Sequence, residues 1–215
     1  MMKLFGTLIV LNLLSLAACT DAQAMSVSWQ GSTAVMTSSQ SFLTDWLVAY
    51  SFRNDLAIAA RAMRMTMADR SEMKFFAPQL DYLLHRWNEQ NFQANVYLNG
   101  AFGVQVTLGK TSRVGIGTFE SDIESRTYYA SAKVQENFVG IGANQFQSEF
   151  RLGLAPYKAD YEELASWLMI SVQNNPALVR NLSITPLVRI FYKSVLVELG
   201  SNLQGDWMFN SMIHF

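Results

Sequence analysis

The chain has 215 residues, of which 50% are hydrophobic and only 15% carry a charged side chain. The 16 Lys and Arg residues stand against 17 Asp and Glu residues, so the excess of positive charge that a nucleic-acid-binding protein needs is missing. The single cysteine, Cys19, excludes a disulfide framework, a Cys-rich zinc site and a CxxC redox motif. The length suits one sizeable domain.

Residues 1–24 have the organisation of a secretory signal peptide. Lys3 is followed by a short apolar stretch, from Leu4 to Ala18, and then by small residues. This pattern predicts a cleaved export signal and a mature chain in which residues 25–215 form one domain.

Two processing sites compete within this segment. The sequence Leu-Ala-Ala-Cys that ends at Cys19 resembles a bacterial lipobox, in which cleavage before the cysteine makes it a lipidated N-terminus. The sequence Ala-Gln-Ala that ends at Ala24 fits the small-x-small pattern of ordinary signal peptidase. The protein is therefore an exported chain that begins either at a lipidated Cys19 or after Ala24.

The remainder of the chain alternates between apolar and polar residues, which indicates β-strands. From Phe92 to Val106 the even-numbered positions are mostly apolar and the odd-numbered ones mostly polar, and a second clear alternation runs from Trp207 to Phe215. Pro78 and Pro186 fall inside predicted strands, where a proline is expected only at a bulge or near the rim of a sheet. The pattern predicts twelve strands, at 31–39, 43–52, 55–67, 72–88, 91–106, 113–124, 126–138, 145–156, 160–173, 182–192, 194–203 and 206–215.

The spacing of these strands favours a closed barrel. Bacterial outer-membrane barrels have an even number of strands, with short turns on the periplasmic side and longer loops outside. With both termini in the periplasm, residues 53–54, 125, 157–159 and 193 make short periplasmic turns, and residues 107–112, 139–144 and 174–181 make longer outer loops. A count of ten strands is the alternative, but it leaves residues 107–125 as one long periplasmic loop. We therefore expect an all-β, closed, antiparallel, up-and-down transmembrane barrel of about twelve strands.

The last nine residues resemble the C-terminal signature of Gram-negative outer-membrane β-barrels. Trp207, Phe209, Ile213 and Phe215 match this signature, whereas Ser211 is small and polar where an apolar residue is usual. In that family the terminal strand ending in Phe is recognised by the barrel-assembly machinery. The resemblance implies that the protein lies in the outer membrane, with its lipids and the assembly machinery as partners. A periplasmic, lipid-tethered β-sandwich is the soluble alternative.

Over most of residues 31–215 the chain is also similar to a group of uncharacterised proteobacterial outer-membrane proteins. The shared sequences are Leu-Leu-His-Arg-Trp-Asn at 83–88, Gln-Ala-Asn at 93–95, Ala-Pro-Tyr at 155–157, Thr-Pro-Leu-Val-Arg at 185–189 and Val-Glu-Leu-Gly at 197–200. This resemblance implies a barrel fold and no particular function.

The charged residues of the predicted strands are expected to face the barrel interior. An Arg or Lys facing lipid at the membrane midplane costs about 2–4 kcal/mol, and Asp81 and His85 in particular are expected to share one inner face. The lining would either be a salt-bridged filling that stiffens a narrow barrel or a selective lining for a small solute, which the sequence does not name. The predicted lumen residues are Asp81, His85, Glu120, Asp122, Lys133, Glu149, Arg151, Arg189 and Glu198.

Two further functions stay open as alternatives. Met63, Met65 and Met67 alternate along one strand and Met73 follows the next turn, so their thioethers form either a soft-ligand row for copper or ordinary apolar packing. With the polar groups of the lumen, the row would make the protein an outer-membrane metal- or small-ligand-binding protein. Only two histidines are present and no Gly-x-Ser-x-Gly element, which leaves a membrane-embedded hydrolase built on His85 as a weak alternative. The sequence thus favours a porin-like narrow channel or structural barrel over an enzyme, and it predicts no cofactor.

Overall fold

The computed structural model describes residues 26–139, 145–160, 162–178 and 181–215. The predicted processing sites at Cys19 and Ala24 lie outside the described residues. Twelve antiparallel strands make up the fold: β1 (Thr33–Gln40), β2 (Leu43–Arg53), β3 (Leu56–Thr66), β4 (Glu72–Asn88), β5 (Gln93–Thr107), β6 (Lys110–Glu124), β7 (Tyr128–Val139), β8 (Gln145–Leu154), β9 (Ala165–Asn174), β10 (Leu182–Tyr192), β11 (Val195–Ser201) and β12 (Trp207–His214).

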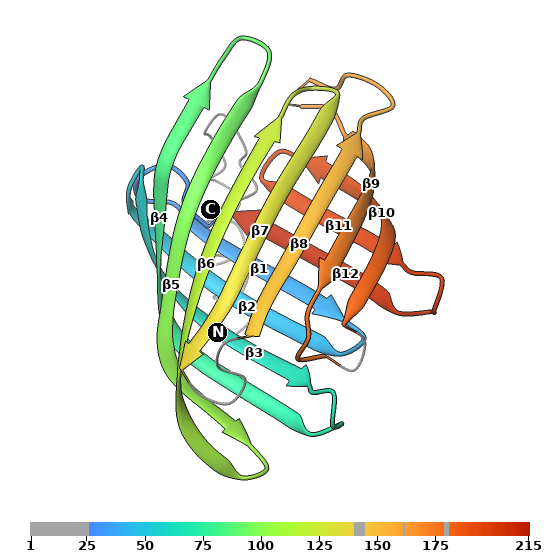
Figure 1. Ribbon diagram of the computed structural model, residues 1–215. Coiled ribbons are helices and arrows are strands. Elements are labelled where there is room, and N and C mark those ends of the chain that lie inside the picture. Colours follow the sequence, from blue (N-terminus) through green and yellow to red (C-terminus); the bar gives the residue numbers. More distant parts are fainter. Residues whose placement is uncertain (1–25, 140–144, 161, 179–180) are drawn as a thin grey trace, which may run out of the picture.

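Each strand pairs with its neighbours in the sequence, and β1 pairs with β12, so the sheet closes into a barrel (Figure 1). The closing register runs from Ala34 opposite His214 to Gln40 opposite Met208. Backbone hydrogen bonds in both directions between Thr33 and Phe215, of 3.1 and 2.9 Å, extend it by one pair. The prediction of a closed twelve-stranded barrel is confirmed, and neither ten strands nor a two-sheet sandwich describes the fold.

The lengths of the loops differ from those expected. We call the end of the barrel that holds Thr33 and Phe215 the terminal end, and the opposite end the far end. The β5–β6 connection at the far end is a turn of only Leu108 and Gly109, whose φ angles of 51° and 73° are both left-handed, as in the tight primed hairpin turns. The longest connection, residues 155–164, lies at the terminal end because β9 begins at Ala165. The strand count was therefore right, although the loop lengths that favoured it were partly wrong.

Both strand prolines lie where hydrogen bonding to one neighbouring strand is interrupted. Pro78 stays in register with Ala60 of β3, but the pairing of β4 with β5 skips from Phe76 to Gln79. Pro186 pairs with Ile170 of β9, and the pairing of β10 with β11 begins one residue later, at Leu187. On these sides the neighbouring strand is not paired at the proline, so the N–H group that proline lacks costs the ladder no hydrogen bond.

The wall of the barrel is uneven in height. Strand β4 has 17 residues and β5 and β6 have 15 each, whereas β11 has 7 and β1 and β12 have 8 each. Figure 1 shows the β4–β5 and β5–β6 hairpins projecting beyond the rest of the barrel at opposite ends. The seam where β12 meets β1 belongs to the short side.

The outer surface is apolar. Large side chains that are at least half exposed occur on most of the wall, among them Phe76, Leu98, Phe102, Phe150, Leu168, Ile184 and Leu199. Exposed aromatic residues also lie toward both ends, with Tyr50, Tyr128 and Phe215 at the terminal end and Trp46 and Trp207 at the far end. Within the described parts of the chain, no helix is long and apolar enough to cross a membrane.

Candidate functional site: a braced and capped barrel interior

A cavity of about 270 Å³ occupies the middle of the barrel. Among the described residues, the charged side chains that line it are four bases and four acids. They are Arg61, Lys133, Arg151 and Arg189 against Asp45, Glu120, Glu149 and Glu198. We call this space the central cavity. Its lining carries no excess of either charge.

Arg61 of β3 forms the first connection across the interior. Its guanidinium binds both oxygens of Asp45 on the adjacent strand β2, with a shortest distance of 2.7 Å. It also donates from Nη2 to Oε1 of Gln135 at 3.3 Å. Gln135 lies on β7, four strands away from β3, so this hydrogen bond crosses the lumen instead of following the wall.

Glu198 of β11 forms the centre of the second connection. Its carboxylate accepts from Arg189 of β10 at 2.7 Å, from Asn210 of β12 at 2.6 Å and from Arg151 at 2.8 Å. Arg151 lies on β8, three strands away from β11, and also binds Glu149 beside it at 2.6 Å. The side chain of Glu198 is 1% exposed, and its charge is compensated by two guanidinium groups.

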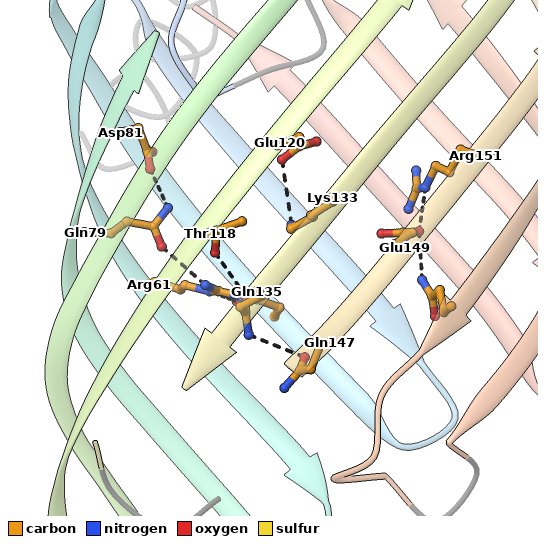
Figure 2. A network of polar contacts seen from close by, with 12 residues as sticks. Arg61, Gln79, Asp81, Thr118, Glu120, Lys133, Gln135, Gln147, Glu149 and Arg151 are labelled. Carbon is orange, nitrogen blue, oxygen red and sulfur yellow. Dashed lines mark hydrogen bonds and ion pairs between the residues drawn. The ribbon is translucent and has the colours of Figure 1, made fainter. Parts of the chain in front are cut away.

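Amide and hydroxyl side chains extend the first of these clusters as far as β8 (Figure 2). Gln135 donates to Gln147 of β8 at 3.4 Å, and Thr118 donates to Gln135 at the same distance. The remaining ion pair, Lys133 with Glu120, is loose at 4.0 Å and partly exposed. The polar contacts therefore form two separate hydrogen-bonded groups within one polar layer of the lumen, with the loose pair of Lys133 and Glu120 beside them.

The terminal end of the lumen is covered from inside by residues Ser26–Gly31, which we call the inner segment. Val27 is completely buried and packs among Ala34, Ala49, Ala57, Ala59, Leu83 and Tyr97. The backbone N–H of Ser28 donates to Oγ of Ser51 at 3.1 Å, and the Trp29 ring lies 5.7 Å from the ring of His214. Small alanine side chains on the wall make room for this segment, which packs against the inner wall near His214.

The far end is covered by the connection that follows β9. Ala177 and Leu178 are buried against Met63, Met65 and Met73. The N–H of Ala68 donates to the carbonyl of Ala177 at 2.9 Å, and Met67 forms an isolated bridge with Leu178. The central cavity thus lies between two packed clusters of side chains, one toward each end of the barrel.

The structure places eight of the nine predicted lumen residues on the inner side of the wall: Asp81, Glu120, Asp122, Lys133, Glu149, Arg151, Arg189 and Glu198. His85 is the exception, and its expected place beside Asp81 is corrected. A bulge between Leu83 and His85 inserts one extra residue, which reverses the inward and outward positions from there on. His85 is exposed, with its ring 4.2 Å from Trp87 on the outer wall, while Arg86 turns inward and donates to Asn95.

Asp45 and Arg61 were absent from the predicted lining, although together they make its closest bidentate pair. A signal for Asp45 was present in the alternation of β2, because Trp46, Val48 and Tyr50 take the outer positions. Arg61 could not be placed from its strand alone, since Arg64 on the same strand has the opposite orientation. Arg64 lies outside near the far end, where Glu72 and Lys74 provide a charged environment.

The methionine row is accounted for by packing in the far-end cap. Met63, Met65 and Met73 are between 2% and 6% exposed and contact apolar neighbours such as Phe75. Among the described residues no group of three or more His, Cys, Asp or Glu side chains could hold a metal ion. Copper binding by the methionines stays a prediction, as does the recognition of Trp207, Phe209, Ile213 and Phe215 by the assembly machinery. Trp207, Phe209 and Ile213 share the outer face of β12, and Phe215, which directly follows the strand, is exposed as well.

Comparison with solved structures finds the KdgM porin, alone and in complex with disordered oligogalacturonate. In each case the identity is 9%, the TM-score is 0.49, and the match covers 86% of this chain and 98% of the other. No family model matches the chain, and no curated protein matches it. The similarity to the uncharacterised proteobacterial group therefore stays a prediction, and the fold assignment comes from the closed sheet of this chain itself.

Proposed function

We propose that the protein is an outer-membrane barrel that acts as a narrow channel for small, neutral or zwitterionic polar solutes. The observation that carries this proposal is the inversion of polarity between a closed apolar exterior and an ionised interior. Soluble monomers seldom expose contiguous apolar areas above a few hundred Å², whereas lipid requires both an apolar face and a sheet without free edges. The exported chain that the sequence predicts would meet such lipid in the outer membrane.

The size and charge of the lining support the choice of solute. Rings of one charge sign select ions of the other sign, but the central cavity presents four bases and four acids. The connections from Arg61 to Gln135 and from Arg151 to Glu198 cross the lumen, so a large solute could not pass without breaking them. A small solute that carries both donors and acceptors can exchange hydrogen bonds with this layer.

Conductance in planar bilayers and swelling of protein-containing liposomes test the proposal. We expect the wild-type barrel to give small unitary currents and to admit glycine but exclude a tetrasaccharide. The double variant Asp45→Asn/Arg61→Ala removes the first connection without leaving an unpaired charge, and we expect its unitary conductance to rise at least twofold. The control Arg64→Ala removes an exposed arginine of the same strand and should leave the current unchanged.

The structural-barrel alternative makes a different prediction for the same measurements. If neither the wild type nor the double variant conducts ions or admits glycine, the channel proposal is wrong and the interior serves only to stiffen the barrel. A mobility shift on boiling in detergent confirms that each variant tested is folded.

A further inference from the structure

His214 is a buried histidine that takes no part in the two hydrogen-bonded groups of the lumen. It is the last residue of β12, lies on the inner side of the wall and is 4% exposed. Its Nε2 is 3.3 Å from the sulfur of Met212, which stands two residues earlier on the same face. A thioether is only a weak hydrogen-bond acceptor, so hydrogen bonding alone gives little reason for placing an imidazole against it.

A second thioether faces this pair from the neighbouring strand. Met36 of β1 is the direct cross-strand partner of Met212, and both methionines line the central cavity. Directly opposite residues on paired strands have Cβ atoms about 4.5–5.5 Å apart, and the methionine side chain is long and flexible. The sulfur of Met36 can therefore reach the place where the sulfur of Met212 meets Nε2 of His214.

The chemistry of these three side chains selects one kind of ion. Two thioethers and one neutral imidazole carry no negative charge, and the next inward residue of β12, Asn210, is bound to Glu198. Calcium and magnesium require oxygen ligands, and zinc takes thiolate, imidazole or carboxylate ligands. Thioethers select Cu(I), which imidazole also suits, and a single positive charge is less costly to bury among neutral ligands than a double one.

We propose that Met36, Met212 and His214 form a binding site for a soft monovalent cation, Cu(I) or the chemically similar Ag(I), on the inner face of the barrel seam. The ion enters from the central cavity, which both methionines line, and is held by two sulfur atoms and Nε2. The ring of Trp29 lies 5.7 Å from that of His214, so the inner segment covers the imidazole on its other side. Because the ligands come from β1 and β12, the bound ion joins the two strands that close the barrel.

This site is separate from the methionine row predicted from the sequence. Met63, Met65 and Met73 pack with Phe75, Ala177 and Leu178 near the far end, and no described histidine belongs to that cluster. The seam site instead combines an imidazole with thioethers from two paired strands. The two groups of methionines can therefore be removed independently, and each serves as the control for the other.

The first test is calorimetric titration of the purified barrel with Ag(I) in chloride-free buffer. We expect one tightly bound ion per chain for wild type. Met36→Leu/Met212→Leu removes both sulfurs with little change in side-chain volume, and it should bind at least tenfold more weakly. The matched control Met63→Leu/Met65→Leu removes two thioethers near the far end and should bind like wild type. Absence of binding by wild type, or loss of binding in the control alone, overturns the proposal.

The second test identifies the ligands by X-ray absorption at the copper edge, on protein loaded with Cu(I) without oxygen. We expect sulfur and nitrogen neighbours in wild type, and the loss of the nitrogen neighbour in His214→Phe, with the sulfur neighbours retained. A spectrum without sulfur, or one that His214→Phe leaves unchanged, contradicts the site. The mobility shift on boiling shows that each variant is folded, and neither test depends on whether the barrel conducts.

Discussion

At the scale of single residues, the interior contains ion pairs of very different strength. Glu198 is buried and accepts from two arginines and an asparagine, whereas the pair of Glu120 with Lys133 is 4.0 Å long and the lysine side chain is 39% exposed. Breaking a buried pair by removing one partner leaves an uncompensated charge, but a partly exposed pair is screened by water. The same substitution should therefore have unequal effects at these two positions.

We expect Glu198→Ala to lower the free energy of unfolding by about 3–5 kcal/mol, because Arg151 and Arg189 lose their shared carboxylate. The matched variant Glu120→Ala should cost about 1 kcal/mol or less. Urea-induced unfolding of the barrel in lipid vesicles measures both values. Similar losses for the two variants would show that Glu198 is no more important to the barrel than a partly hydrated pair.

At the scale of elements, β4 leaves no room for a side chain at Gly103 of β5, where the pairing of the two strands is interrupted at Pro78. A Cβ atom added at Gly103 would lie 2.2 Å from the carbonyl oxygen of Phe76 and 2.6 Å from Cβ of Ala77, whereas one added at Gly100 meets nothing within 4 Å. The two glycines lie on the same strand, three residues apart. The first is needed for the close approach of two strands, and the second is not.

Gly103→Ala should therefore destabilise the barrel by about 1–3 kcal/mol, because backbone atoms must move to admit the methyl group. Gly100→Ala should change stability by less than about 0.5 kcal/mol, or raise it slightly, because alanine loses less conformational entropy on folding. The midpoint of urea unfolding compares the two variants directly. A large loss for Gly100→Ala would mean that strand flexibility, and not the approach of β4, governs this region.

The elements also show what the sequence could and could not predict. The alternation of apolar and polar residues identifies twelve strands and their faces, because the side-chain period of a strand is fixed at two. It fails at His85, where one bulged residue reverses the inward and outward faces of β4. It also fails at the β5–β6 turn, because Leu108 adopts a left-handed φ, a conformation that a leucine in the sequence does not predict. The contact of Arg61 with Gln135 was also beyond reach, since it depends on which distant strands face each other across the closed barrel.

At the scale of the whole molecule, closure depends on the shortest part of the wall. A transmembrane β-strand usually needs about 9–11 residues, but β11 and β12 have 7 and 8 and β1 has 8. Ser211 lies in the middle of this seam, paired with Thr37 of β1 on one side and with Val197 of β11 on the other. Few backbone hydrogen bonds hold the seam, so the loss of one should lower the stability of the entire barrel.

We expect the unboiled wild type to migrate faster in detergent gels than the boiled protein, because a closed barrel stays compact until heat opens it. Ser211→Pro removes one N–H from the seam and introduces a ring that a central strand tolerates poorly, so its compact band should convert at a temperature at least 10 °C lower. Ser211→Thr keeps the N–H and a β-branched side chain that suits a strand, and it should convert like wild type. Conversion of Ser211→Pro at the wild-type temperature would show that closure is held by the side-chain connections of the interior and not by the ladder at the seam.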